Sequence, residues 1–169
     1  SAALDESVCA PGFVPEAKAD GTYGVKEGAY VARVNGVGYE TLAEAIAAAN
    51  AGDTITLLCD VTETDAANAN IVYDLTGKTL DLGGFTYSHN NFAHVFAGTD
   101  GVIRNGKIVA LNGGSYALFV GDDTIETTRF LVENAELTGG INVYHAANVT
   151  LKDLTVNGTN YYVVWMDED

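Results

Sequence analysis

The chain has 169 residues, with 8 Lys and Arg against 23 Asp and Glu, so its formal net charge at neutral pH is −15. This length allows one principal core, and a hydrophobic content of 47% excludes an intrinsically disordered chain. An acidic chain is repelled by phosphate groups, which excludes nucleic acid and anionic membranes as expected partners. No stretch has the roughly 18 to 20 consecutive apolar residues that span a bilayer, so membrane insertion is not expected.

Residues 1–34 are predicted to form a small N-terminal β-hairpin or linker module. The hairpin turn is Ala19-Asp20-Gly21, because Asp-Gly is a strong tight-turn signal, and β-forming residues flank it on both sides. A two-stranded hairpin is hardly stable alone, so we expect it to pack on other structure. Residues 35–169 form the second predicted domain. The chain begins without a signal-peptide pattern, and we expect it to be an excised piece of a longer protein, truncated at its C-terminus.

The clearest local signal is a short amphipathic helix of about ten residues after Tyr39. Thr41 is a good N-cap, and Glu44, three residues later, completes a capping box. Apolar residues then recur at helical spacing, and Gly52 suits the C-terminal cap. We interpret this helix as a lid on a β-sheet. The following segment, residues 53–61, alternates like one strand with Ile55, Leu57, Cys59 and Val61 on one face.

A degenerate β motif fills the rest of the chain. Four segments align in one register, with a Gly or short polar residue between two apolar positions. The first apolar position is occupied by Leu82, Ile103, Val132 and Leu151, the second by Tyr87, Ile108, Leu137 and Val156, and the position between them by Gly84, Asn105, Asn134 and Asp153. Repeats of 20 to 30 residues predict a parallel β-solenoid, in which each coil buries its apolar face only against its neighbours.

Each interval between these segments holds a second strand-like piece. These pieces are residues 93–96, 117–120, 141–144 and 162–165, and we expect them to form a second sheet of the same coils. Asn105, Asn134, Asn148 and Asn157 are expected at stacked corners, where their amides bond to each other and to the backbone.

The predicted helix and the Ala51-Gly52-Asp53-Thr54-Ile55 sequence after it resemble the capping segment of right-handed parallel β-helix domains of the pectin-lyase-like class, particularly in bacterial cell-surface and adhesin-like repeat proteins. The resemblance covers residues 30–166, and residues 8–28 resemble the hairpin that links modules in such proteins. It implies an all-β, right-handed parallel β-helix with an N-terminal capping α-helix and a preceding β-hairpin. About five coils are present, fewer than is common in the class. We therefore expect either that the chain was cut at its C-terminal end or that this open end is covered by a second copy in an end-to-end homodimer.

Many members of this class cleave polysaccharides, so a catalytic site must be considered. Asp122, Asp123 and Glu126 share one predicted loop, but the register supplies no matching acid on the adjacent rung, and a solvated corner explains them better. The histidines and the two cysteines, Cys9 and Cys59, have no metal-ligand spacing. The cysteines could form a disulfide or remain two free thiols. We expect no enzyme, cofactor or metal.

The residues best suited to binding are aromatic side chains and histidines in the later coils. Aromatic rings can stack on sugars where they face outward. The candidate set is Tyr144, His145, Tyr162, Trp165, His89 and His94.

Three functional readings remain open, of which one is a purely structural repeat that binds nothing by itself. The first is a non-enzymatic extracellular module of a bacterial surface protein, acting as a rigid spacer or as an adhesion surface for glycans or host proteins. The alternative is a fragment of a carbohydrate-active enzyme, either a polysaccharide lyase or a glycoside hydrolase. The charge of −15 makes acidic polysaccharides poor ligands, so neutral glycans and basic protein surfaces come first.

Overall fold

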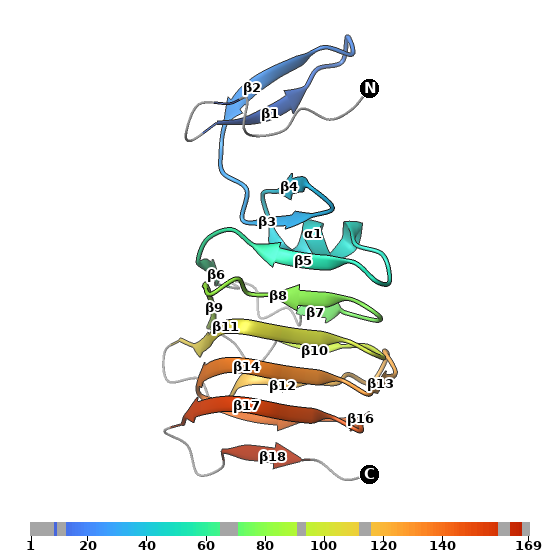
Figure 1. Cartoon of the computed structure of the whole chain (residues 1–169), viewed down its shortest axis with the longest axis vertical. Coiled ribbons are helices and arrows are strands. Elements are labelled where there is room, and N and C mark those ends of the chain that lie inside the picture. Colours follow the sequence, from blue (N-terminus) through green and yellow to red (C-terminus); the bar gives the residue numbers. More distant parts are fainter. Residues whose placement is uncertain are drawn as a thin grey trace.

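The computed structural model describes residues 9, 13–64, 71–90, 94–111, 116–158 and 163–166 (Figure 1). The chain is a mostly β protein in which parallel strands stack as a β-solenoid of about 4 turns, with a short helix near one end and a hairpin before it. This confirms the predicted fold class.

The N-terminal hairpin consists of β1 (Phe13–Ala17) and β2 (Tyr23–Glu27), which pair antiparallel. Gly21 has a φ of 81°, and the backbone N–H of Thr22 donates to the Asp20 carboxylate at 2.9 Å, so the predicted Asp-Gly turn is confirmed. Two further strands, β3 (Ala32–Val34) and β4 (Val37–Tyr39), form an antiparallel pair on either side of the predicted domain boundary between residues 34 and 35. The division into two modules stays a prediction.

The helix α1 (Leu42–Ala48) begins as predicted. The Thr41 hydroxyl accepts a hydrogen bond from the backbone N–H of Glu44 at 3.2 Å, and Leu42, Ala45 and Ile46 are buried. The helix is shorter than predicted, because Ala49 is already extended and is the C-cap. Gly52, predicted as the cap, lies in the following turn with a φ of 92°.

Lys78 supplies the positive charge that α1 lacks in its own last turn. Its Nζ donates to the carbonyl oxygens of Ile46 and Asp74, each at 3.1 Å. A cation near free carbonyl groups at a helix C-terminus is stabilising. The second coil is thereby joined to the helix that covers the first.

The long sheet contains one face of every coil. Its order is β17-β14-β11-β8-β5-β3-β4, and β9 pairs with both β11 and β6. From β5 to β17 the strands are parallel, and β3 is antiparallel to β5. The bounds are β5 (Thr54–Leu57), β6 (Val61–Glu63), β8 (Thr79–Asp81), β9 (Thr86–His89), β11 (Val102–Ala110), β14 (Leu131–Thr138) and β17 (Thr150–Asn157).

The second apolar position of the repeat forms a column through this sheet. Tyr87 pairs with Ile108, Ile108 with Leu137, and Leu137 with Val156. The first three side chains are fully buried. This part of the predicted register is confirmed.

At the first apolar position, the predicted pairing of the first two repeats is wrong. Ile103 pairs with Leu80 and not with Leu82, because β8 ends at Asp81 and a turn containing Gly83 and Gly84 precedes β9. Leu82 is buried beside this turn, and a Cβ added to Gly106 would lie 2.4 Å from its Cβ. The segment from Leu80 to Tyr87 is two residues longer than the paired segment from Ile103 to Ile108. The absence of a side chain at Gly106 leaves room for Leu82 in this longer segment.

The single strand predicted for residues 53–61 is also wrong. The chain bends after Leu57, and Val61 starts β6, so Cys59 does not continue the buried face of Ile55 and Leu57. Cys9 and Cys59 are free thiols and both are half-buried.

The second sheet is confirmed and is wholly parallel. Its order is β18-β15-β12-β10-β7, with bounds β7 (Ile71–Asp74), β10 (His94–Ala97), β12 (Tyr116–Val120), β15 (Gly140–Val143) and β18 (Val164–Met166). In Figure 1, β7, β10 and β12 lie behind strands of the long sheet, and β18 lies below β17. The shared core lies between the two sheets and includes Phe96, Phe130 and Leu118.

Outward-facing polar side chains are joined from rung to rung. Arg104 Nε lies 2.9 Å from Asp81 Oδ2, and Lys152 Nζ lies 3.1 Å from Glu133 Oε2. These four residues occupy one row of the sheet, so acid and base alternate along it.

Part of the expected amide ladder is present, at Asn105 and Asn134 within β11 and β14. Asn134 Nδ2 donates to Asn105 Oδ1 at 2.9 Å, and Asn105 Nδ2 donates to Asp81 at 3.0 Å. Asn105, Asn134 and Asp153 all have positive φ, a backbone conformation that Asn and Asp tolerate better than most residues. Asn148 likewise has a φ of 56°, and Asn157 instead donates to Glu136.

The described part of the chain contains no helix with both the length and the apolar character needed to cross a bilayer.

The role of Lys78 can be tested by replacing it with Met, which keeps the aliphatic stem and removes the ammonium group. We expect the free energy of unfolding to fall by about 1 kcal/mol, because two carbonyl groups lose a charged donor. Thermal unfolding with Lys18→Met as the control measures this, since Lys18 is exposed on the hairpin. Equal melting temperatures for the two variants would contradict the capping role.

Candidate functional site

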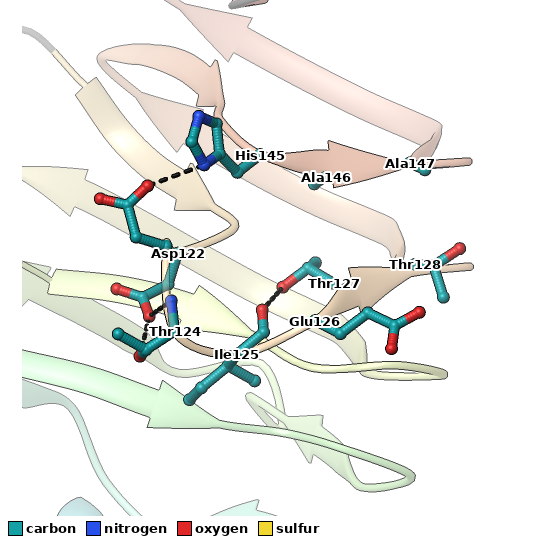
Figure 2. Close-up of a pocket in the computed structure, with 10 residues that line it drawn as sticks. Asp122, Thr124, Ile125, Glu126, Thr127, Thr128, His145, Ala146 and Ala147 are labelled. Atoms are coloured by element: carbon teal, nitrogen blue, oxygen red, sulfur yellow. Dashed lines mark hydrogen bonds and ion pairs between the residues drawn. The ribbon is translucent and has the colours of Figure 1, made fainter. Parts of the chain in front are cut away.

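An open hollow of about 800 Å³ lies at one corner of the solenoid (Figure 2). Its walls are the loop after β12 and the segment after β15, which belong to successive coils. The polar residues that line it are Asp122, Asp123, Thr124, Glu126, Thr127, Thr128 and His145, and the apolar ones are Ile125, Ala146 and Ala147.

Two very short strands hold the walls of this corner hollow together. They are β13 (Thr127–Thr128) and β16 (Ala146–Ala147), which pair parallel. Thr127 is buried; its hydroxyl accepts from the backbone N–H of Gly98 and donates to the Ile125 carbonyl, both at 3.0 Å. The corner is thus tied to the coil before it.

Gly121 allows the loop to leave β12 close to the next coil. It has a φ of 103°, and an added Cβ would lie 1.8 Å from the carbonyl oxygen of Tyr144. Only glycine fits this position without moving the backbone.

Asp123 and His145 meet across the corner hollow. Asp123 Oδ1 lies 2.7 Å from His145 Nδ1. The side chains are 62% and 33% exposed, so both remain within reach of a ligand in solvent. The contact orients the imidazole ring, whose nitrogens can take part in hydrogen bonds with a ligand.

The imidazole of His145 is also supported by the preceding residue. The rings of Tyr144 and His145 stack with centroids 4.0 Å apart and planes at 11°. His145 has a φ of 46°, which turns the chain at this corner. The ring is therefore held from one side by a carboxylate and from another by a phenol ring.

Asp122 is fixed by its own loop. Its Oδ1 accepts from the backbone N–H of Thr124 at 2.8 Å and also from the Thr124 hydroxyl. These hydrogen bonds, of which the one from the hydroxyl is the larger influence, hold the pKa of the Asp122 carboxyl below its ordinary value of 3.8. Asp122 is therefore ionised at neutral pH.

The other predicted binding residues lie elsewhere. His89 is buried in the core, where its Nε2 lies 2.8 Å from the Ala117 carbonyl oxygen, so it does not face solvent. Trp165 is in β18, is 39% exposed, and is not among the residues that line the corner hollow. His94 is in β10, with its side chain outside the described set, and Tyr162 lies outside the described residues. A binding role for the six predicted residues stays a prediction.

Sequence reasoning missed the link between the Asp122–Asp123 loop and His145. These residues are 22 positions apart, and their contact depends on a pair of two-residue strands that leave almost no pattern in the sequence. The available signal was Gly121, a glycine directly after a buried strand.

Among the described residues, no group of three or more His, Cys, Asp or Glu side chains is arranged to hold a metal ion. The chemistry available at the corner hollow is hydrogen bonding by carboxylates, hydroxyls and an oriented imidazole, together with stacking on a ring.

No family model, curated protein or solved structure matches the chain. The functional argument therefore depends on the geometry described above.

The state of Asp122 predicts how the loop responds to acid. The pKa of Asp122 is lower in the folded chain than in the unfolded chain, so ionised Asp122 stabilises the fold. This stabilisation is complete at pH values above the unfolded pKa of 3.8, and it is lost as the pH falls through the lower folded pKa. Carboxyl NMR titration should give an Asp122 midpoint below 3.8, and Thr124→Ala should move that midpoint upward. A wild-type midpoint above 3.8, or one that Thr124→Ala leaves unchanged, would contradict the hydrogen-bonding account.

Proposed function

We propose that the chain is a non-enzymatic, extracellular module of a bacterial surface protein, in which a rigid parallel β-helix of the pectin-lyase-like class carries a binding corner for neutral glycans. The observation that carries the proposal is the corner hollow itself, where Asp123 orients His145 on the surface of a registered stack.

Rigidity is supported by the way the coils are joined. Apolar columns run through successive rungs in one register, and ion pairs such as Arg104 with Asp81 and Lys107 with Glu136 link neighbouring rungs outside. A stack of this kind keeps the loops on its corners at fixed positions, which suits both a spacer and an adhesion surface.

A neutral glycan matches the chemistry of the corner hollow. Carboxylates of Asp122 and Glu126 can accept hydrogen bonds from sugar hydroxyls, and the Tyr144–His145 rings offer a partly apolar edge. Acidic polysaccharides would meet several carboxylates and a chain of net charge −15. A host protein with a basic surface is the other partner that this charge favours.

One observation favours the alternative of a carbohydrate-active enzyme. Asp122, Asp123 and Glu126 line the same hollow, and polysaccharide cleavage uses pairs of carboxyl groups. A lyase or hydrolase fragment would release reducing ends or unsaturated products, and Asp122→Asn would abolish that release.

Binding to immobilised neutral and acidic glycans, followed by product analysis of the bound sugars, tests the proposal. We expect binding to neutral glycans without turnover, weakened roughly tenfold or more by His145→Ala. Glu16→Ala is the matched surface control and should bind as the wild type does, because Glu16 is exposed on the hairpin. Binding that survives His145→Ala, or no glycan binding at all, would contradict the proposal; product release would favour the enzyme.

A further inference from the structure

The outer faces of the two sheets differ in their chemistry. The long sheet carries acid and base in alternation, as in the row from Asp81 to Lys152. In the second sheet, the strand register instead aligns five uncharged residues, one from each strand, in a single row. The members of this row, called here the outer row, are Val72, Val95, Phe119, Asn142 and Trp165. A chain of net charge −15 therefore has an uncharged stripe along its stack.

The outer row faces away from the core. The residue that follows it in each of β7, β10, β12 and β15 is buried, namely Tyr73, Phe96, Val120 and Val143. The row members in the same four strands are half-buried. Because successive side chains of a strand point to opposite faces, the outer row lies on the outside of the second sheet. It runs along the side of the solenoid and does not belong to either end of the stack.

Two aromatic rings lie at the centre of this outer face. The rings of Tyr116 and Phe119 are 5.3 Å apart between centroids, with their planes at 84°. The register partner of Tyr116 in the next coil is Gly140, which has no side chain that could cover the ring. Rings held edge to face in this way are fixed in position and provide apolar surface for another ring to pack against.

Asn142 adds an unused hydrogen-bond acceptor beside these rings. It is the register partner of Phe119, and its Oδ1 is buried without a hydrogen-bond partner among the residues that the structure describes. A buried acceptor without a donor destabilises a fold, so an apolar residue would suit this position better if only stability mattered. A hydroxyl group can donate to this oxygen once the side chains that cover it move aside. Asn142 therefore indicates a partner that has hydrogen-bond donors as well as an apolar surface.

The outer row adjoins the corner hollow. Phe119 precedes Asp122 by three residues in the coil of β12, and Asn142 precedes His145 by three residues in the next coil. Three residues of a strand span roughly 10 Å. A ligand that occupies the corner hollow and is longer than one sugar unit therefore reaches the rings of the outer face.

We propose that the outer row, together with Tyr116, extends the corner hollow and binds the further sugar units of a linear neutral glycan. This inference rests on the proposed function, in which the first sugar unit occupies the corner hollow. Sugar rings pack on Phe119 and Tyr116, and a sugar hydroxyl donates to Asn142 Oδ1. The uncharged row has no basic side chain to pair with an acidic glycan, which makes the neutral polymer the matching ligand.

Calorimetric titration of the intact chain with monosaccharides and linear hexamers of glucose, mannose and galactose tests this inference. We expect at least one hexamer to bind about tenfold or more tightly than its monosaccharide. Phe119→Ala should remove this gain and leave monosaccharide binding unchanged, because the corner hollow is intact. The matched control is Phe13→Ala, since Phe13 is 43% exposed on the hairpin, and it should bind both ligands as the wild type does.

Asn142→Leu provides a second variant, which keeps the volume of the side chain and removes the unused acceptor. We expect it to raise the melting temperature and to weaken hexamer binding about fivefold, because one hydrogen bond to the glycan is lost. A merely structural role for Asn142 would not give this combination. Circular dichroism establishes that all three variants are folded.

The inference is overturned if the hexamers bind no more tightly than the monosaccharides, or if the gain survives Phe119→Ala. In both cases the proposed function stands, because monosaccharide binding that depends on His145 is still observed. Absence of any binding to neutral sugars overturns the inference and the proposed function together. Capture of a protein partner that Phe119→Ala abolishes, without a gain for hexamers, would assign the outer row to protein docking and also overturn the inference.

Discussion

In-register stacking of apolar side chains from successive coils is the interaction on which the rest of this structure depends. A single coil cannot bury its own inward residues, so Ile108 is shielded from water only because Tyr87 and Leu137 lie directly on either side of it. Burying a side chain of this size is worth about 1.5 to 3 kcal/mol, and each rung repeats the gain. The capping helix and the β3–β4 hairpin follow from the same constraint, since the first coil also needs a cover.

The stacking also restricts which charged side chains can lie next to one another on the outer surface of the solenoid. Neighbouring parallel strands lie about 4.8 Å apart, so like charges in one outward row would repel strongly. The row from Asp81 to Lys152 avoids this by alternating acid and base, and Arg129 pairs with Asp100 at a corner in the same way. Arg104, Lys107, Arg129 and Lys152 are thus each matched by an acid, and loops such as the one that forms the corner hollow add further negative charge. The charge of −15 is consistent with a soluble surface around a stacked core.

Sequence patterns predicted the features that depend on local chemistry or on a repeated spacing. Thr41 and Glu44 indicated the helix start, and the apolar repeat indicated both sheets and the column through Ile108. The patterns failed where one coil differs from its neighbours in length: the turn at Gly83 and Gly84 shifts the pairing of Ile103 from Leu82 to Leu80. They also did not predict the contact between Asp123 and His145. A contact between corners of different coils depends on the number of residues in each loop and not on any local preference.

Methyl-to-methyl and methyl-to-aromatic NOE measurements on the intact chain test the registered stack most directly. The account predicts contacts that link Tyr87, Ile108, Leu137 and Val156 in that order, together with a contact between Ile103 and Leu80. An antiparallel sandwich would instead give contacts between strands that follow one another in the chain. Absence of the Ile108–Leu137 contact, with such hairpin contacts in its place, would contradict the solenoid and the functional account built on it.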